Sequence, residues 1–291
     1  MNWKKCRIEP GQPVRLSKMS TVAGKLYGKK ELKEKLAAYI DEIADLQNRL
    51  YAENRQSLLI IFQGMDSSGK DSTIKQIMRG INPQGIVVYS FKHPSELELE
   101  HDYLWRHVQK LPEHGQIVVF NRSHYENVLI SKVHPKLLLA ERLPGIDTID
   151  KVNEEFWRER YAQINYFEKN TTQNGTQVLK FFLHISKEEQ RNRFLERINN
   201  REKHWKFSSA DITERSYWNA YQDAYEQALE NTSTEIAPWF AIPADDKPHA
   251  HLLIAKIVAE KLRSMDPRFP QIDTQEKKRM GEAKKKLLKE K

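Results

Sequence analysis

Five short apolar runs divide the chain, over residues 57–63, 86–91, 116–120, 178–185 and 239–242. Each run has the length of a β-strand, and the segments between them carry apolar residues at helical spacing. The first four runs are nearly continuous in apolar residues, as expected for strands that are buried on both faces. This alternation predicts an α/β fold, a three-layer α/β/α sandwich around a parallel sheet of about five strands.

A long helical pattern precedes the first of these strands. Between residues 29 and 53, apolar residues recur at steps of three and four, which is typical of an amphipathic helix packed along one face. We assign this helix a structural role or a place at an oligomer interface. Residues 1–28 hold scattered prolines and glycines among basic residues, which predicts an extended arm with little core of its own. Residues 266–291 form a basic tail, either a short helix or a disordered end. One domain, over residues 29–265, is therefore expected between arm and tail.

The composition is that of a soluble globular protein. With 39% hydrophobic and 10% aromatic residues, the 291-residue chain can bury a substantial core. No apolar stretch approaches the roughly 18 to 20 residues that cross a bilayer, and the N-terminus lacks the apolar region of a signal peptide. We therefore expect a cytoplasmic protein without a membrane partner. Cys6, the single cysteine, lies in a polar segment, and it excludes an intrachain disulfide and a Cys-based zinc site. The 48 basic and 40 acidic residues give a formal charge of +8, which favours an anionic partner of some kind.

Candidate chemistry is concentrated where the first strand ends. The segment GMDSSGK has the spacing of a phosphate-binding P-loop (Walker A), in which backbone N–H groups at a helix N-terminus cradle phosphate oxygens. Lys70 would add a mobile positive charge. Asp71 replaces the Ser or Thr that normally reaches Mg²⁺, so the motif is a variant. A carboxylate beside phosphates needs a cation between them, and we read Asp66 as facing Mg²⁺, with Mn²⁺ as an alternative. The phosphate- and nucleotide-binding candidates here are Gly64, Met65, Ser67, Ser68, Gly69, Asp71 and Ser72.

A second set of polar residues follows the third strand, at the edge of the sheet where ligands bind in open α/β folds. Asn121 stands where a P-loop enzyme often has a metal-binding Asp, which weakens that assignment. Arg122 can contact a transferring phosphoryl group, and Glu126 lies four residues further on the same side of the helix that follows. An ordinary intrahelical ion pair between Arg122 and Glu126 is the alternative. Asn121 and Tyr125 are counted among the nucleotide-binding candidates.

A basic segment follows the fourth strand, over residues 187–207. Arg193, Arg197 and Arg201 recur every four residues, so on a helix they form one cationic stripe. Such a stripe is usually a solvated face, and neighbouring glutamates offset part of its charge. Its position after a strand end favours instead a lid, which closes over phosphates, excludes water and supplies arginines to the transition state.

Five segments occur in a characteristic order: GMDSSGKDST, FNRSHYENVL, LHISKEEQRNRF, KHWKF and TSTEIAPWFAIPADDK. With them the chain closely resembles the polyphosphate kinase 2 family from about residue 30 to residue 264. The resemblance implies a P-loop fold of the thymidylate kinase kind and Mg²⁺-dependent phosphoryl transfer between inorganic polyphosphate and nucleotides. It matches the family's loop Asp and Lys to Asp66 and Lys70, its strand-end Arg to Arg122, and its lid Arg to Arg193. The sequence NRSHYE resembles the subgroup that accepts both nucleoside mono- and diphosphates, while the Asn in it leaves open which groups hold the metal.

Phosphoryl transfer needs alignment and charge compensation more than covalent participation of the protein. We therefore expect Asp66 and Glu126 to hold the metal, Lys70 and the loop to cradle phosphates, and Arg122 with Arg193 to compensate developing charge. Polyphosphate offers no base to recognise, so a basic groove would serve it as an electrostatic track. The candidates for this groove are Lys75, Arg191, Arg197, Arg201 and Lys203.

The expected substrates are polyphosphate as donor, with AMP and ADP as acceptors, ATP as a product and guanine nucleotides as counterparts. A nucleotide kinase with ATP as donor is one alternative. A nucleic-acid-binding protein on a P-loop scaffold is the other, but the chain has no recognisable nucleic-acid-binding motif. We expect no nucleic-acid partner, and a homo-oligomer, either a dimer or a tetramer.

Overall fold

The computed structural model describes residues 3–24 and 27–290; residues 1, 2, 25 and 26 of the expected arm and residue 291 of the tail lie outside the described residues. Its centre is a five-stranded, all-parallel sheet in the order β2-β3-β1-β4-β5. The strands are β1 (Ser57–Gln63), β2 (Ile86–Ser90), β3 (Ile117–Asn121), β4 (Thr176–His184) and β5 (Trp239–Pro243). The predicted strands and the parallel α/β fold are thus confirmed, with strand ends shifted by at most two residues.

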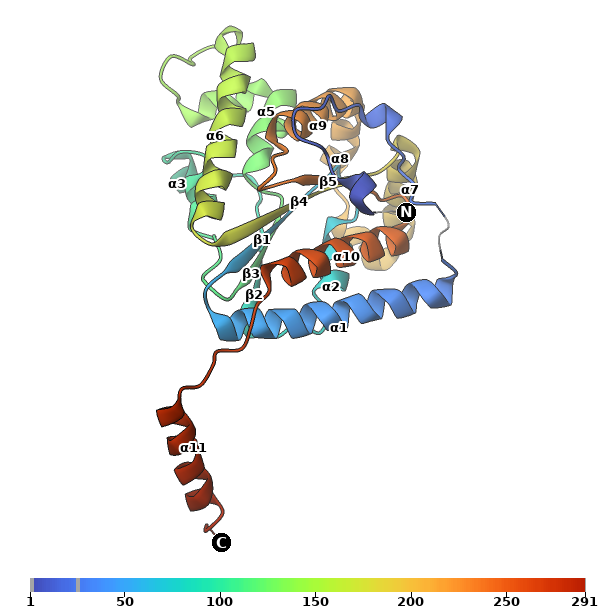
Figure 1. Ribbon diagram of the computed structural model, residues 1–291. Coiled ribbons are helices and arrows are strands. Elements are labelled where there is room, and N and C mark those ends of the chain that lie inside the picture. The colour runs from blue at the N-terminus through green and yellow to red at the C-terminus, as the bar shows by residue number, and fades with distance from the viewer. Residues whose placement is uncertain (1–2, 25–26, 291) are drawn as a thin grey trace.

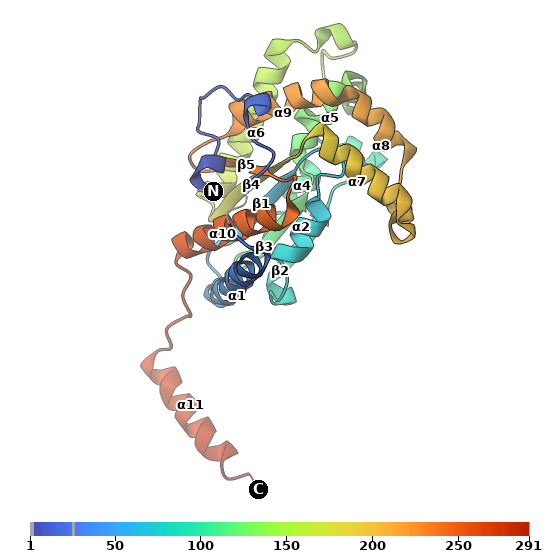
Figure 2. The ribbon, with the colours of Figure 1, turned by 90° about the vertical axis from the view of Figure 1, so that its right-hand side faces the viewer.

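Helices cover both faces of this sheet (Figures 1 and 2). One face carries α1 (Lys29–Glu53), α2 (Lys70–Ile77) and α10 (Lys247–Met265), and the other carries α5 (Ile130–Val133), α6 (Glu154–Gln173) and α9 (Trp218–Thr232). The predicted helix over residues 29–53 is confirmed to the residue, and its periodic apolar residues are buried. The remaining short α-helices are α3 (Glu96–Leu99) and α4 (Trp105–Val108), and the 3₁₀ helices outside the lid are η1 (Trp3–Cys6), η2 (Leu16–Lys18), η3 (Pro83–Gly85), η4 (His124–Val128), η5 (Pro135–Glu141) and η6 (Ile149–Lys151).

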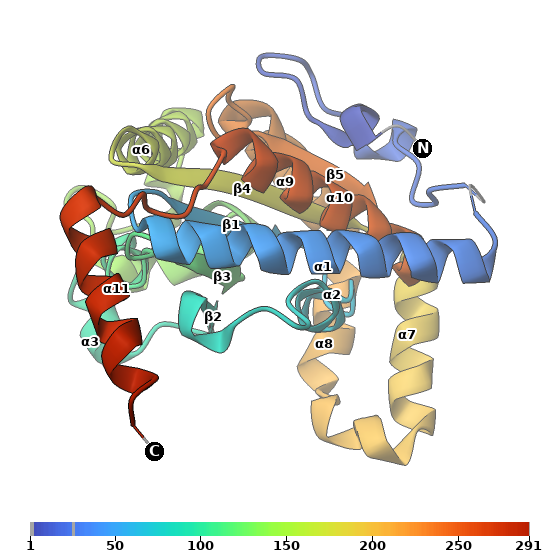
Figure 3. The same cartoon turned by 60° about the horizontal axis from the view of Figure 1, so that its bottom comes forward.

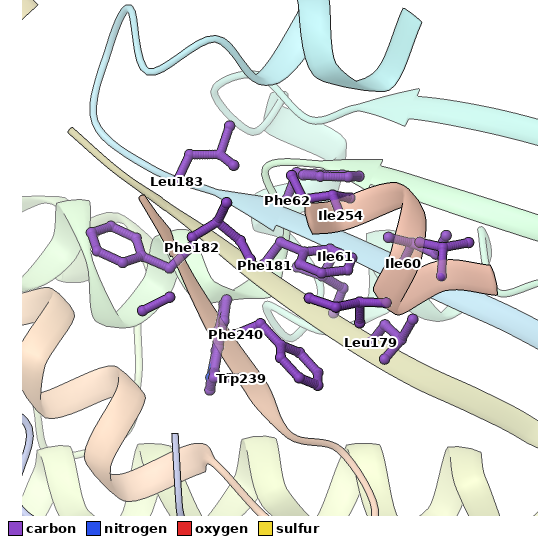
Figure 4. Packing of buried hydrophobic residues seen from close by; sticks show 14 of the residues in the cluster. Ile60, Ile61, Phe62, Leu179, Phe181, Phe182, Leu183, Trp239, Phe240 and Ile254 are labelled. Carbon is purple, nitrogen blue, oxygen red and sulfur yellow. The ribbon is translucent and has the colours of Figure 1, made fainter. Parts of the chain in front are cut away.

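The strand β1 lies in the core, and all of its residues are buried. Figure 4 shows Ile60, Ile61 and Phe62 interleaved with side chains of β4 and β5. Phe62 lies opposite Phe181 in the strand register, and their rings stack with centroids 5.2 Å apart. Because β1 is held between β3 and β4, the loop that leaves its carboxyl end starts from the most constrained part of the sheet.

The N-terminal arm packs against the domain. The backbone N–H of Ile8 donates to the carbonyl oxygen of Trp239 at 2.9 Å, and Arg7 forms an antiparallel bridge with Phe240 in β5. Its apolar residues, among them Ile8 and Leu16, join the domain core. Cys6 is buried although its neighbours in the sequence are polar, and this burial raises the pKa of its thiol to about 11.

Two segments project from the body. The lid consists of α7 (Lys187–Asn199), η7 (Arg201–Lys206), α8 (Ser209–Glu214) and η8 (Arg215–Tyr217), and α7 and α8 form the two arms of a U (Figure 3). It therefore extends beyond the segment marked by its basic residues. The C-terminal helix α11 (Thr274–Leu287) stands away from the sheet, with all of its residues exposed (Figure 1). Among the described residues, no helix combines the length and apolar character needed to span a bilayer.

Candidate active site

The loop after β1 has a backbone that only glycine allows at its first turn. Gly64 has φ of +155°, and a Cβ atom there would lie 2.7 Å from Ser68 Oγ and 3.0 Å from the carbonyl oxygen of Leu183. Gly69 has φ of +100° directly before α2, and Ser67 adopts φ of +61°. The chain therefore turns tightly between the buried strand and the helix N-terminus, as a phosphate-binding loop requires.

Lys70 folds back over this loop. Its Nζ donates to the carbonyl oxygens of Gly64 at 2.6 Å and of Met65 at 3.3 Å. Burial and the neighbouring guanidinium of Arg122 lower the pKa of Lys70 to about 8, although Asp66 opposes the shift. The ammonium is thus poised at the loop and has only backbone carbonyls as hydrogen-bond acceptors.

Arg193 holds the loop from the lid side. All five of its N–H groups are used: Nε donates to Glu189, Nη1 to the carbonyl oxygens of Ser67 and Ser68, and Nη2 to those of Ala244 and Asp245. The side chain lines the cleft but is 6% exposed. Arg193 was expected to compensate charge on a reacting phosphate, and in this structure its donors instead fix the loop to the connection between β5 and α10.

Arg122 lies between two carboxylates at the end of β3. Its Nη2 is 2.9 Å from Asp66 Oδ1, and its Nη1 is 3.5 Å from Glu126 Oε2. Glu126 and then Asp66 raise the pKa of Arg122 above its usual value, which keeps the guanidinium charged. The ion pair that was the alternative reading of Arg122 and Glu126 is present, and it belongs to a three-residue cluster at the loop.

This cluster fits a divalent cation that is shared with substrate. Magnesium in kinase sites is usually held by one or two carboxylates together with substrate phosphates. Asp66 and Glu126 supply two carboxylates around one guanidinium. Within the described part of the chain, no group of three or more His, Cys, Asp or Glu side chains is arranged to hold a metal. Water and substrate phosphate oxygens are the usual further ligands of a magnesium ion held in this way.

The two departures from the usual motif contact each other. Asn121 Nδ2 donates to Asp71 Oδ1 at 2.8 Å, and Lys206 of the lid lies 3.1 Å from Asp71 Oδ2. Partial burial opposes ionisation of Asp71, but the hydrogen bonds from Asn121 and Lys206 hold its pKa below the usual value. A carboxylate thus lies at the start of α2, hydrogen-bonded to the amide that stands at the strand end, where other P-loop enzymes often carry an Asp.

The loop opens into a cleft of about 730 Å³ under the lid. The predicted residues that line it are Asp66, Ser67, Ser68, Gly69, Lys70, Asp71, Ser72, Asn121, Arg122 and Arg193. Of the predicted polyphosphate-binding set, Arg197 and Lys203 also line it, and Arg197 Nη2 donates to Ser67 Oγ at 2.7 Å. The other three members are exposed and do not line the cleft: Lys75, Arg191 and Arg201.

Three further cations line this cleft and were missed: Lys92, Lys206 and Lys247. Lys206 and Lys247 lie in the KHWKF and PADDK segments, whose basic residues were available as a signal. Lys92 follows β2 at the carboxyl edge of the sheet, where the ends of parallel strands meet. Position relative to the sheet edge was therefore a better guide to the cleft than helical spacing.

A smaller cavity of about 230 Å³ adjoins the cleft and was also missed. Its walls include Phe91, Leu99 and Ile130, and it shares Arg122 with the cleft and has Glu126 in its lining. Tyr125, a predicted nucleotide-binding residue, reaches neither cavity. Its side chain is fully buried, and its hydroxyl donates to Glu168 Oε1 at 2.7 Å, so this prediction is not supported.

A glycine-rich loop between a central parallel strand and a helix, with a cationic lid over the same sheet edge, defines a P-loop phosphotransferase. The chain belongs to the polyphosphate kinase 2 family, whose model matches residues 27–270. A kinase family of this kind implies a divalent cation in the transfer.

Named relatives align over nearly the whole chain. An ADP-polyphosphate phosphotransferase of Rhodopseudomonas palustris is 47% identical over 287 residues, which cover 98% of this chain and 98% of the relative. An AMP/ADP-polyphosphate phosphotransferase of Meiothermus ruber is 40% identical over 277 residues, covering 94% of this chain and 98% of the relative. The crystal structure of polyphosphate kinase 2 from Arthrobacter aurescens is similar with a TM-score of 0.85 at 34% identity, over 95% of each chain.

The environment of Lys70 predicts a pH limit on anion binding. With a pKa of about 8 in the free protein, the ammonium loses its charge as the pH rises through that value. Affinity for inorganic tripolyphosphate, measured by calorimetry from about pH 6 to about pH 10, should fall several-fold above this midpoint. Lys70→Arg stays charged over this range and should not show the fall. An equal fall in both proteins would assign the titration to another group.

Proposed function

We propose that this protein is a Mg²⁺-dependent phosphotransferase that uses inorganic polyphosphate to phosphorylate AMP and ADP. The observation that carries the proposal is the position of Arg122, which lines both the cationic cleft and the smaller apolar cavity. A phosphoryl group passing from a polyanion in one to a nucleotide in the other would pass this guanidinium. The names of the two relatives, one an ADP- and the other an AMP/ADP-polyphosphate phosphotransferase, support the same reaction.

The two cavities differ in the chemistry they offer. The cleft presents the loop and the ammonium or guanidinium groups of Lys92, Arg197 and Lys247, which suits a chain of phosphates without a base. The smaller cavity combines apolar residues such as Phe91, Leu99 and Ile130 with many polar and charged ones, which gives a nucleoside both a surface for its ring and groups that can bind its polar edges. We therefore assign polyphosphate to the cleft and the nucleoside to the smaller cavity.

The protein's part in the reaction is alignment and charge compensation. Lys70 exchanges the carbonyl oxygens of Gly64 and Met65 for phosphate oxygens of the donor. Arg122 donates hydrogen bonds from its planar guanidinium to oxygen atoms of the transferring phosphoryl group. Asp66 and Glu126 would hold Mg²⁺, which when bound neutralises charge on the phosphate oxygens. Arg193 keeps the loop in shape and does not contact the substrate directly.

Further points belong to the same proposal. Guanine nucleotides are additional acceptors, and Mn²⁺ can replace Mg²⁺. The catalytic unit is the single domain over residues 29–265, between an N-terminal arm and a basic tail. It works in the cytoplasm as a dimer or a tetramer.

The donor and acceptors can be identified in one assay. Purified protein with Mg²⁺ and long-chain polyphosphate as sole donor should convert AMP to ADP, ADP to ATP, and GMP and GDP to the corresponding products, followed by chromatography. Lys70→Ala should lose activity by about a hundredfold or more, because one preorganised charge at the reacting phosphates is removed. Phosphorylation of the acceptors with ATP as donor, but not with polyphosphate, would instead identify a nucleotide kinase. Salt-dependent nucleic-acid binding without turnover would favour the scaffold alternative.

The positions of the lid cations predict which of them contribute to polyphosphate binding. Lys203→Ala should raise KM for polyphosphate several-fold and weaken its dependence on salt, because one cationic contact is lost from the cleft. Arg201→Ala is the matched control, since this residue is close in sequence but does not line the cleft. Initial rates at several salt concentrations give both quantities. An equal effect of the two substitutions would show that the cleft is not the polyphosphate track.

Glu126 is expected to set the preference for the shorter acceptor. AMP must place its α-phosphate where ADP places its β-phosphate, and a carboxylate with bound cation or water can bridge the gap. Glu126→Asn should therefore lower kcat/KM for AMP about tenfold more than for ADP, or about 1.4 kcal/mol of transition-state binding. Asp66→Asn, by contrast, should reduce both reactions alike. A parallel loss in Glu126→Asn would make Glu126 a general metal or structural residue.

A further inference from the structure

A lysine lies in the interior beneath the site, with no contact to solvent. Lys180 extends from β4 and has an exposed fraction of 0%. Its Nζ donates to the hydroxyl of Tyr125 at 2.9 Å, to Glu168 Oε2 at 2.5 Å and to the carbonyl oxygen of Thr232 at 2.7 Å. All three ammonium donors are therefore satisfied within the protein.

Stability alone is a weak reason for this arrangement. Taking a charged pair out of water costs several kcal/mol per ion, and replacing such a pair by apolar residues of similar volume is often neutral or stabilising. Burial would raise the pKa of Glu168, but the charge of Lys180 outweighs it and keeps that pKa below its usual value. Lys180 and Glu168 therefore form a charged contact in the interior, and we look for its role in the side chains that it fixes in position.

What it holds is Tyr125. The tyrosine hydroxyl accepts from Lys180 and donates to Glu168 Oε1 at 2.7 Å, so both members of the pair fix one oxygen atom. The ring meets that of Trp239 edge to face, with centroids 4.7 Å apart. Trp239 Nε1 donates to Thr232 Oγ1 at 2.9 Å, which ties the same cluster to the end of α9. Tyr125 is thus fixed at its ring and at its hydroxyl.

Tyr125 in turn belongs to the turn that carries the site. Arg122 precedes η4 and Glu126 lies within it. Arg122 has φ of +63°, a left-handed conformation that costs about 1 to 3 kcal/mol for a residue with a Cβ and needs surrounding contacts to persist. On the near side, its N–H donates to the carbonyl oxygen of Phe62 at 3.1 Å. On the far side, Ser123 Oγ accepts from the N–H of Tyr125 at 3.2 Å.

We propose that Lys180 and Glu168 are positioning residues for phosphoryl transfer, which act by anchoring Tyr125 and thereby the turn that aims Arg122 and Glu126. The proposal rests on the role given to Arg122 in the proposed function. The pair does not touch the substrate. Its effect is therefore expected mainly on the rate of transfer and not on the capture of polyphosphate, because the cations of the cleft other than Arg122 lie on other elements.

The test removes both charges together, so that no unpaired charge is left in the interior. Lys180→Met/Glu168→Leu should remain folded, with a Tm near that of the wild type or above it. Its kcat should fall about tenfold or more, as expected when a reacting group is misplaced, while KM for polyphosphate changes little. The matched control is Ser57→Ala/Thr176→Val, which removes a buried polar contact of 2.8 Å at the opposite edge of the sheet and should keep kcat.

A second comparison separates positioning from general support of the fold. If the pair acts through Arg122, adding the double replacement to Arg122→Ala should lower kcat little further, whereas independent effects would multiply. Tyr125→Phe keeps the ring but removes the shared hydroxyl, and it should show the same non-additivity if the double variant does not fold. A wild-type kcat in the double variant, or multiplying effects, would overturn the positioning role while leaving the proposed function standing. A near-wild-type kcat in Arg122→Ala alone would overturn the role given to Arg122, and the positioning role with it, while leaving the phosphotransferase activity itself in place.

Discussion

The geometry of the site depends on one guanidinium whose N–H groups all bind the protein itself. Arg193 donates to carbonyl oxygens of the phosphate loop and of the connection between β5 and α10, and to Glu189 within its own helix. These hydrogen bonds fix the orientation of the peptide groups of Ser67 and Ser68, and thereby the shape of the loop that would receive phosphate. Because Arg193 belongs to α7, its hydrogen bonds connect the base of the lid directly to the phosphate loop, and Arg197 of the same helix adds a hydrogen bond to Ser67 Oγ.

The charges around the loop form a compensated set in which each cation already has anionic or carbonyl partners. Arg122 lies between Asp66 and Glu126, and Asp71 accepts from Asn121 and Lys206. Such a set carries its cations in place before the ligand arrives, which lowers the reorganisation needed when phosphates bind. With Asp71 in place of the usual Ser or Thr and Asn121 in place of the usual Asp, the two positions together still carry one acidic group, but it lies at the start of α2 and not at the end of β3.

Local patterns were sufficient for the strands, the long helix α1 and the phosphate loop, because periodicity and turn chemistry act over a few residues. They failed where a side chain's direction depends on a turn. Tyr125 lies in the 3₁₀ helix η4, which begins two residues after Arg122. This turn directs the tyrosine side chain into the core, away from the ligand-binding edge of the sheet. Arg193 and Arg201 are eight residues apart, which on one continuous helix would place them on the same face. Because α7 ends at Asn199, Arg201 lies outside this helix, and only Arg193 of the two is directed to the phosphate loop by it. The burial of Cys6 depends on an arm that meets β5 more than two hundred residues later, which no local pattern records.

The contact between that arm and β5 also covers part of the outer strand on this side of the sheet. An outer strand presents unpaired backbone groups that can recruit a strand from another molecule, and proteins commonly cover or shorten such strands. Here Ile8 donates to Trp239 and Arg7 bridges Phe240, so the N-terminal segment occupies part of the margin that β5 would otherwise expose. At the other margin, β2 has only five residues, Ile86–Ser90. The arm thus covers part of the outer strand, and the sheet margin at β5 presents fewer unpaired backbone groups to another molecule than it would without these contacts.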